Sequence, residues 1–129
     1  IGYADASQAG NLGVANVQVG EEFVPYSAEA AATAVEVSPR EEGREDNDIV
    51  MDLARDTTES GSYPIVLVAY MIMCGSYADQ DSADNVKAYA SYVVSEEGQQ
   101  VAADNAGSAP LTEGLREEAL ASIDGITAG

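Results

Sequence analysis

The chain has 129 residues, 46% of them apolar, which is enough for one domain with a hydrophobic core and argues against a disordered or fibrous protein. Its 23 acidic residues outnumber five basic ones, so the net charge is -18, and Lys87 is the single lysine. The carboxylates are spread along the chain, which favours solubility in a salty or extracellular setting, and so anionic a surface repels nucleic acid and acidic membrane headgroups.

The beginning of the chain predicts short elements. "IGYAD" has the pattern of the end of a buried strand, so we expect the chain to have been cut from a longer protein. "VANVQVGEEFV" predicts a β-hairpin that turns at Gly20. An alanine-rich helix is expected from Ser27, a typical N-cap, to Val37, with Pro39 just beyond its end.

Two polar segments lead from this helix to the middle of the chain. The run from Arg40 to Asp48, "REEGREDND", has no apolar residue and predicts a solvated loop. Residues Ile49 to Ala54 alternate as in a strand with one wetter face. A turn would follow, and Pro64 favours an extended Tyr63, so the turn would feed directly into the next segment.

The segment from Ile65 to Cys74 is apolar without a break, too short for a membrane span, and typical of a strand that helices cover on both faces. It implies an α/β sheet. Its own half of the chain contains no partner strand, so we expect the rest of the sheet to come from sequence outside this chain. Cys74, the single cysteine, is interpreted as a buried thiol, with half of a disulfide to missing sequence as the alternative.

Three helices are predicted after this strand. The first carries an apolar stripe, the second would begin after Ser95 and end at Gly107, and Thr112 would cap the third. The stripe of the first helix consists of Val86, Tyr89, Ala90, Val93 and Val94, and the third helix has Leu115, Ala119, Ser122, Ile123 and Ile126 on one side.

The residue types argue against catalysis and metal binding. Without histidine there is no Ser-His or Cys-His nucleophile, so we expect no catalytic residue, no metal site, no cofactor and no enzyme. Asp79 to Asn85 is rich in oxygen ligands, but an EF-hand register would place Ala83 at a ligand position and Asp84 where glycine is needed. These acids are therefore interpreted as a turn and the N-terminal cap of the helix that follows.

Several sequence pieces follow one another in a distinctive order: "IGYAD", "FVPYSAEAAATAV", "SYPIVLVAYMIMC", and the run from "VKAYASYVVSEEGQQ" through "SAPL" to the last helix. Together they resemble the carboxy-terminal part of the phosphate-binding proteins of phosphate ABC transporters, over almost the whole chain. No single element is specific, but their order and spacing are. The run from "VSEEGQQVAA" to "APL" is most similar to versions from high-GC Gram-positive bacteria.

The resemblance implies an α/β fold, the C-terminal portion of a two-lobed type 2 periplasmic-binding-protein fold. Residues 1–62 would be the tail of the second, central lobe, Tyr63 and Pro64 the hinge crossing, and residues 65–129 the return segment of the first lobe, a strand plus three helices. The family holds phosphate mostly with residues upstream of "IGY", so no residue of this segment is expected to bind it.

The resemblance also implies partners and a location. The protein would bind inorganic phosphate, deliver it to an ABC permease in the membrane, and work outside the cytoplasm as a cell-surface lipoprotein or in the periplasm. We expect a monomer when intact and no nucleic-acid partner. Two alternatives remain open: a secreted acidic interaction module without a small ligand, and a binding protein for another oxyanion or small solute on the same fold.

Overall fold

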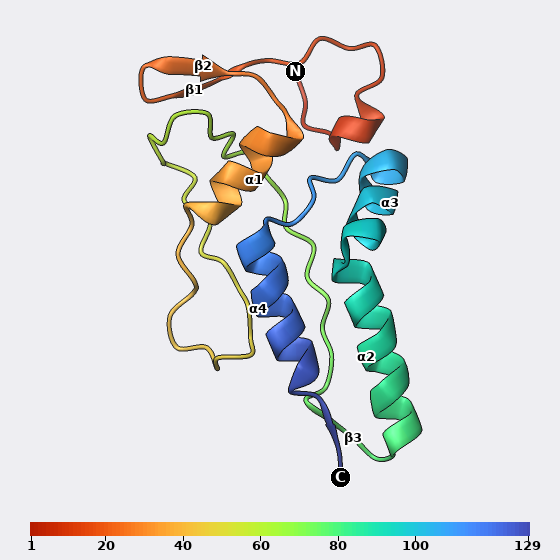
Figure 1. The fold of residues 1–129 in the computed structure, drawn as a ribbon. Helices are drawn as coiled ribbons and strands as arrows, with labels where there is room; N and C mark the ends of the chain where they lie inside the picture. Colours follow the sequence, from red (N-terminus) through yellow and green to blue (C-terminus); the bar gives the residue numbers. More distant parts are fainter.

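The computed structural model describes residues 1–129 and consists of a hairpin and a helix at one end and three helices at the other (Figure 1). No helix is both long enough and apolar enough to cross a membrane. The elements in chain order are η1 (Ala6–Gln8), β1 (Val17–Val19), β2 (Glu22–Val24), α1 (Ala28–Glu36), β3 (Ser76–Tyr77), α2 (Gln80–Val94), α3 (Glu96–Ala106), α4 (Glu113–Asp124) and β4 (Thr127–Ala128).

The hairpin and α1 are confirmed where the sequence predicted them. β1 and β2 pair antiparallel with Val19 opposite Glu22, and Gly20 takes a positive φ of 58° in the turn, a conformation that glycine adopts without strain. Ser27 caps α1, since its hydroxyl accepts a hydrogen bond from the N–H of Ala30 at 3.0 Å. The inner faces meet in a small cluster of Val19, Val24 and Ala30, against which Val17 and Tyr63 pack.

The three later helices are confirmed, and α3 begins and ends as predicted. The other two differ at one end: the acidic run expected as a turn and cap forms the start of α2 from Gln80, and α4 ends at Asp124, before Ile126. Asp79, Ser95 and Thr112 cap α2, α3 and α4 through their side chains, and Gly107 ends α3 in the left-handed region with φ of 66°. In Figure 1, α4 runs antiparallel to α2, and the two helices pack against each other. Their buried cluster is Ala90, Val94 and Ile123, with Met73, Leu111, Ala119 and Leu120 packed around it. Tyr89, expected in the stripe of α2, is 66% exposed and lies outside this cluster.

The end of the chain returns to the start of α2. β3 and β4 form a short parallel pair, and Lys87 on α2 donates from its Nζ to the carbonyls of Asp124 and Ile126, at 2.9 and 3.2 Å. These carbonyls lie at the C-terminal end of α4, where the helix dipole favours a positive charge. The single lysine therefore joins the two antiparallel helices at one end.

Two predicted strands in the first half are wrong. Ile49 to Ala54 forms no strand, and only an isolated antiparallel bridge between Arg40 and Met51 is present there. Ile1 to Tyr3 is exposed and irregular rather than the end of a buried strand. An alternating pattern describes how a strand would bury its side chains, but a strand also needs a neighbour that exchanges backbone hydrogen bonds with it.

The apolar segment from Ile65 to Cys74 is not paired into a sheet in this chain. No backbone-to-backbone hydrogen bond involves any of its residues, and it runs as an irregular segment past α4 and α2 (green in Figure 1). Leu67 and Ile72 are 94% and 95% exposed, whereas Val66 and Val68 are half-buried. The prediction that helices cover both faces is therefore wrong within this chain, because nothing covers the outer side.

Burial is low for a chain of this size. Only 13 of 129 residues are buried, and the accessible area is 8771 Å². The buried residues include two separate hydrophobic clusters of three residues each. A folded monomer of this mass exposes about 6,500 Å². The excess shows that large apolar surfaces, including the segment from Ile65 to Cys74, are left uncovered by the rest of the chain.

Replacing Gly98 with alanine should destabilise the junction of α2 and α3. An added Cβ would lie 2.1 Å from the carbonyl oxygen of Tyr92, which is backbone and cannot rotate away. We expect the free energy of unfolding to fall by about 1–3 kcal/mol, as for overpacked sites. Gly114→Ala is the control, because nothing lies within 4 Å of its added Cβ, and it should be neutral or slightly stabilising. Urea unfolding followed by circular dichroism measures both free energies of unfolding. Equal values for the two variants would contradict the prediction.

Asp79 should make the stability of α2 depend on acid pH. The backbone N–H and the hydroxyl of Ser82 donate to its carboxylate and lower its pKa below the ordinary value of 3.8. A pKa that is lower in the folded state means that the stabilisation is present above pH 3.8 and is lost as the pH falls through the folded pKa.

The comparison variant is Asp79→Asn, whose amide oxygen caps the helix without titrating. The urea midpoint of the wild type should fall relative to that of Asp79→Asn below pH 3.8, and a constant difference down to about pH 3 would contradict the prediction.

Candidate hinge and the grooves beside it

Tyr63 and Pro64 lie where the chain leaves the hairpin and α1 and enters the unpaired segment. The N–H of Tyr63 donates to the carbonyl of Ala30 at 2.9 Å, and its ring meets that of Tyr26 edge to face, with centroids 6.0 Å apart. Pro64 is buried, and its ring restricts the backbone at this point. Tyr63 is therefore anchored to α1 and the hairpin.

Arg55 restrains the first residues beyond the crossing. Its Nη1 donates to the carbonyl of Pro64 at 3.0 Å and its Nη2 to the carbonyl of Val66 at 3.2 Å. The planar guanidinium presents its donors in a fixed fork, which suits two acceptors on one stretch of backbone. Sequence reasoning did not identify Arg55, because both acceptors are main-chain atoms, which leave no signal in residue types.

Ser62, directly before the crossing, is fully buried at 0% exposure, and its hydroxyl has no hydrogen-bond partner. Its N–H is satisfied by the carbonyl of Glu59. A second buried serine, Ser38, differs: its hydroxyl donates to the carbonyl of Ala34 at 2.7 Å and accepts from the N–H of Ala54 at 3.0 Å. An unpartnered buried hydroxyl is destabilising, so Ser62 weakens this part of the structure.

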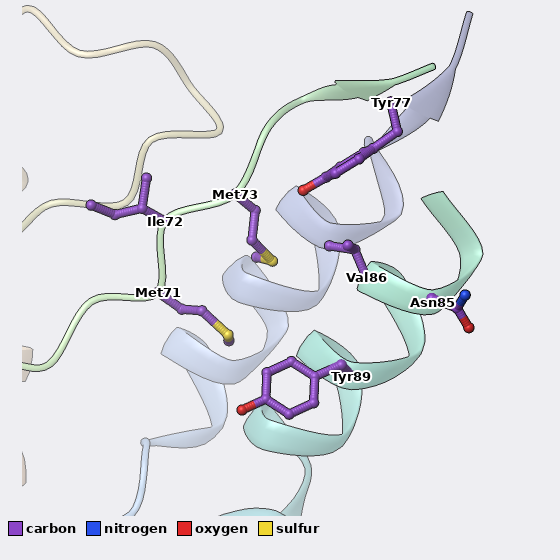
Figure 2. A pocket seen from close by; sticks show the side chains of 7 residues that line it. All are labelled: Met71, Ile72, Met73, Tyr77, Asn85, Val86 and Tyr89. Atoms are coloured by element: carbon purple, nitrogen blue, oxygen red, sulfur yellow. The ribbon is translucent and has the colours of Figure 1, made fainter. Parts of the chain in front are cut away.

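An apolar groove of about 410 Å³ lies between the unpaired segment and α2. Figure 2 shows the side chains of Met71 and Met73 beside α2, with Tyr89 on that helix and Tyr77 at the end of the groove. Six of its seven lining residues are hydrophobic, and none carries a charge. An anion or a metal ion would find no ligand here, whereas an apolar side chain would fit.

Cys74, at the end of the segment, is exposed, so its interpretation as a buried thiol is wrong. It lacks the cover expected there because no neighbouring strand lies beside the segment. Its backbone N–H donates to the hydroxyl of Tyr77 at 3.2 Å. The thiol is free in this chain, which has no second cysteine.

A polar groove of about 280 Å³ separates the loop after α1 from α4. Arg40 is the one cationic side chain that lines it, and Glu118 of α4 already pairs with this guanidinium. Asp46 and Glu118 would repel an anion, and no group of three or more His, Cys, Asp or Glu side chains converges anywhere in the structure to hold a metal ion. Neither groove has the chemistry of an anion or metal site.

Comparison with known proteins assigns the family. The profile of the PBP superfamily domain matches residues 1–97. The chain belongs to the PBP superfamily. No solved structure matches it. The curated relatives include Phosphate-binding protein PstS2 of Mycobacterium bovis (strain BCG / Pasteur 1173P2) and Phosphate-binding protein PstS 2 of Mycobacterium tuberculosis (strain ATCC 25618 / H37Rv).

Each of these relatives is 34% identical to this PBP-superfamily chain over 83 residues, which are 63% of the chain and 22% of the relative. The match therefore spans about a fifth of their length. The family assignment confirms the predicted resemblance and the α/β periplasmic-binding-protein class. It also accounts for the mixture of four helices with small two-stranded sheets, because the chain corresponds to only a part of such a fold.

Ser62 and Ser38 provide a matched test of how a buried hydroxyl affects stability with and without a hydrogen-bond partner. Ser62→Ala removes a buried hydroxyl without a partner and should raise the free energy of unfolding by about 1 kcal/mol. Ser38→Ala should lower it by about 1–3 kcal/mol, because the N–H of Ala54 loses its acceptor. Thermal or urea unfolding of both variants measures the difference. A loss of stability in Ser62→Ala as large as that in Ser38→Ala would contradict this account of the crossing.

Proposed function

We propose that this chain is the C-terminal segment of the extracytoplasmic solute-binding component of a high-affinity phosphate ABC importer. The observation that carries the proposal is the 34% identity over 83 residues to two proteins named phosphate-binding. Inorganic phosphate is then the ligand, and an ABC permease in the membrane is the partner. The protein works as a cell-surface lipoprotein or in the periplasm, and its task is binding and delivery rather than catalysis.

In this proposal the polypeptide changes lobe at Tyr63 and Pro64. Residues 1–62 are the tail of the second lobe, and residues 65–129 return to the first. The distribution of buried residues supports this division: one cluster is built from the hairpin and α1, the other from α2 and α4, and no buried cluster spans the crossing. Two bodies with separate cores are able to rotate relative to each other without breaking either core.

The unpaired segment supplies the second support. Residues 65–73 are apolar, largely exposed, and lack backbone partners on both edges, although α2 and α4 lie beside them. Buried backbone donors and acceptors in folded proteins are nearly always paired. We therefore assign this segment as an inner strand of the first lobe, with neighbouring strands from the part of the polypeptide upstream of Ile1.

The phosphate ligands belong to that upstream part as well. The apolar groove has no charged residue, and the polar groove has its arginine paired and two carboxylates facing inward. A net charge of -18 does not oppose phosphate binding elsewhere, because a desolvated cleft holds an anion through local hydrogen bonds. This chain contributes hinge, sheet and scaffold.

Isothermal titration calorimetry tests the assignment. The full-length polypeptide should bind inorganic phosphate with submicromolar affinity, and residues 1–129 alone should bind it weakly or not at all, because the ligands are absent. Sulfate is the control anion for selectivity. Submicromolar binding by residues 1–129 would contradict the placement of the ligands, and a full-length protein that binds no anion would favour the acidic interaction module instead.

Hydrogen exchange tests the strand assignment separately. The amides of residues 65–73 should exchange almost without protection in the 129-residue chain, because they donate to no backbone carbonyl. The same amides should be strongly protected in the full-length protein. Equal exchange rates in the two proteins would argue against the strand.

A further inference from the structure

The acidic loop, defined as residues 40–48, connects the first half of the chain to α4. Arg40 forms an ion pair with Glu118, and the hydroxyl of Ser122 donates to the carbonyl of Asn47 at 2.8 Å. Glu118 and Ser122 are four residues apart on α4 and therefore share one helix face. This face is separate from the one that carries Ile123 into the cluster with α2. In Figure 1 the loop and α2 lie on opposite sides of α4.

The loop is held in shape by its own contacts, so it meets α4 as a unit. The bridge between Arg40 and Met51 closes its base. Arg44 pairs with Glu41 and Asp48 inside the loop, at 2.8 and 3.0 Å, and these two carboxylates raise the pKa of Arg44. Arg44 makes no ion pair with α4, whereas Arg40 makes the only ion pair between residues 1–62 and residues 65–129.

Electrostatics give that one pair a specific role. The acidic loop has five carboxylates and two guanidinium groups, and α4 has four carboxylates and one guanidinium group, so each element has a net charge of -3. Two such elements repel each other unless a positive charge lies between them. Arg40 is that charge, and without it the contact between the loop and α4 would be repulsive.

We propose that the acidic loop is an electrostatic strap across the lobe boundary. Through Arg40 and Glu118 it stabilises one relative orientation of the two halves and so sets the balance between open and closed states. The proposal rests on the proposed function, since it takes the crossing at Tyr63 and Pro64 as the hinge of a binding protein. Such a strap stabilises the open and the closed state to different degrees. It therefore changes the affinity for the ligand without contacting the ligand.

Charge reversal in the full-length protein tests the strap. Arg40→Glu and Glu118→Lys each place like charges in contact, so both should shift the Kd for inorganic phosphate in the same direction, by about two- to fivefold for an exposed pair. The double variant Arg40→Glu/Glu118→Lys should restore the wild-type Kd. Glu42→Lys is the control, a charge reversal in the same loop at a residue that forms no ion pair, and it should leave the Kd within twofold. All shifts should shrink in 1 M salt, because the pair is exposed.

A different pattern would overturn the proposal. If Arg40 were instead a phosphate ligand, Arg40→Glu would abolish binding, Glu118→Lys would strengthen it or leave it unchanged, and the double variant would not recover. A shift of the Kd by Glu42→Lys as large as that by Glu118→Lys would reduce the strap to general charge repulsion.

A ligand-free measurement separates failure of the strap from failure of the proposed function. Fluorophores at Glu21→Cys and Glu97→Cys, in a Cys74→Ser background, report the distance between the hairpin and α3 by energy transfer. Arg40→Glu and Glu118→Lys should change the transfer efficiency alike, and the double variant should restore it. This result would support the strap even if the wild type bound no phosphate, whereas unchanged efficiency in both single variants would refute it.

Discussion

The constraint on which the rest depends is that residues 65–73 have no backbone-to-backbone hydrogen bond. Their N–H and C=O groups have no backbone partner, yet their side chains are among the most apolar in the chain. In the proposal above these residues form an inner strand, which would pair their backbone groups and cover their apolar side chains together. Leu67 and Ile72 are exposed and the groove beside α2 is open because no other part of the chain covers this side of the segment.

The contacts between residues 1–62 and residues 65–129 differ in kind from the contacts within each half. Each half has a small apolar cluster built from neighbouring elements, and neither cluster includes buried residues of the other half. Polar contacts join the two halves. Apart from Arg40 with Glu118, they include the hydroxyl of Tyr26 on the carbonyl of Gly107 and the N–H of Met51 on the hydroxyl of Tyr70. Polar contacts at a surface contribute little individually, which is compatible with the lobe motion proposed above.

Sequence reasoning succeeded where the determinants are local and failed where they are not. The side chains of Ser27, Asp79, Ser95 and Thr112 each accept from a backbone N–H three residues away, and these caps were predicted. Ile49 to Ala54 was predicted as a strand from its alternation, but it found no partner beyond a single bridge. Arg55 was missed because its acceptors, nine and eleven residues away, are carbonyls that any residue would supply.

By itself the sequence determined the helices, their caps and the hairpin turn, since each depends on side chains within a few residues of one another. The order of the sequence elements also indicated the resemblance to phosphate-binding proteins. Only the tertiary structure decided that residues 65–73 lack neighbours, that Cys74 is exposed, and that Arg40 reaches Glu118 across 78 positions. Such long-range pairings depend on how elements meet in space, and no local pattern encodes that.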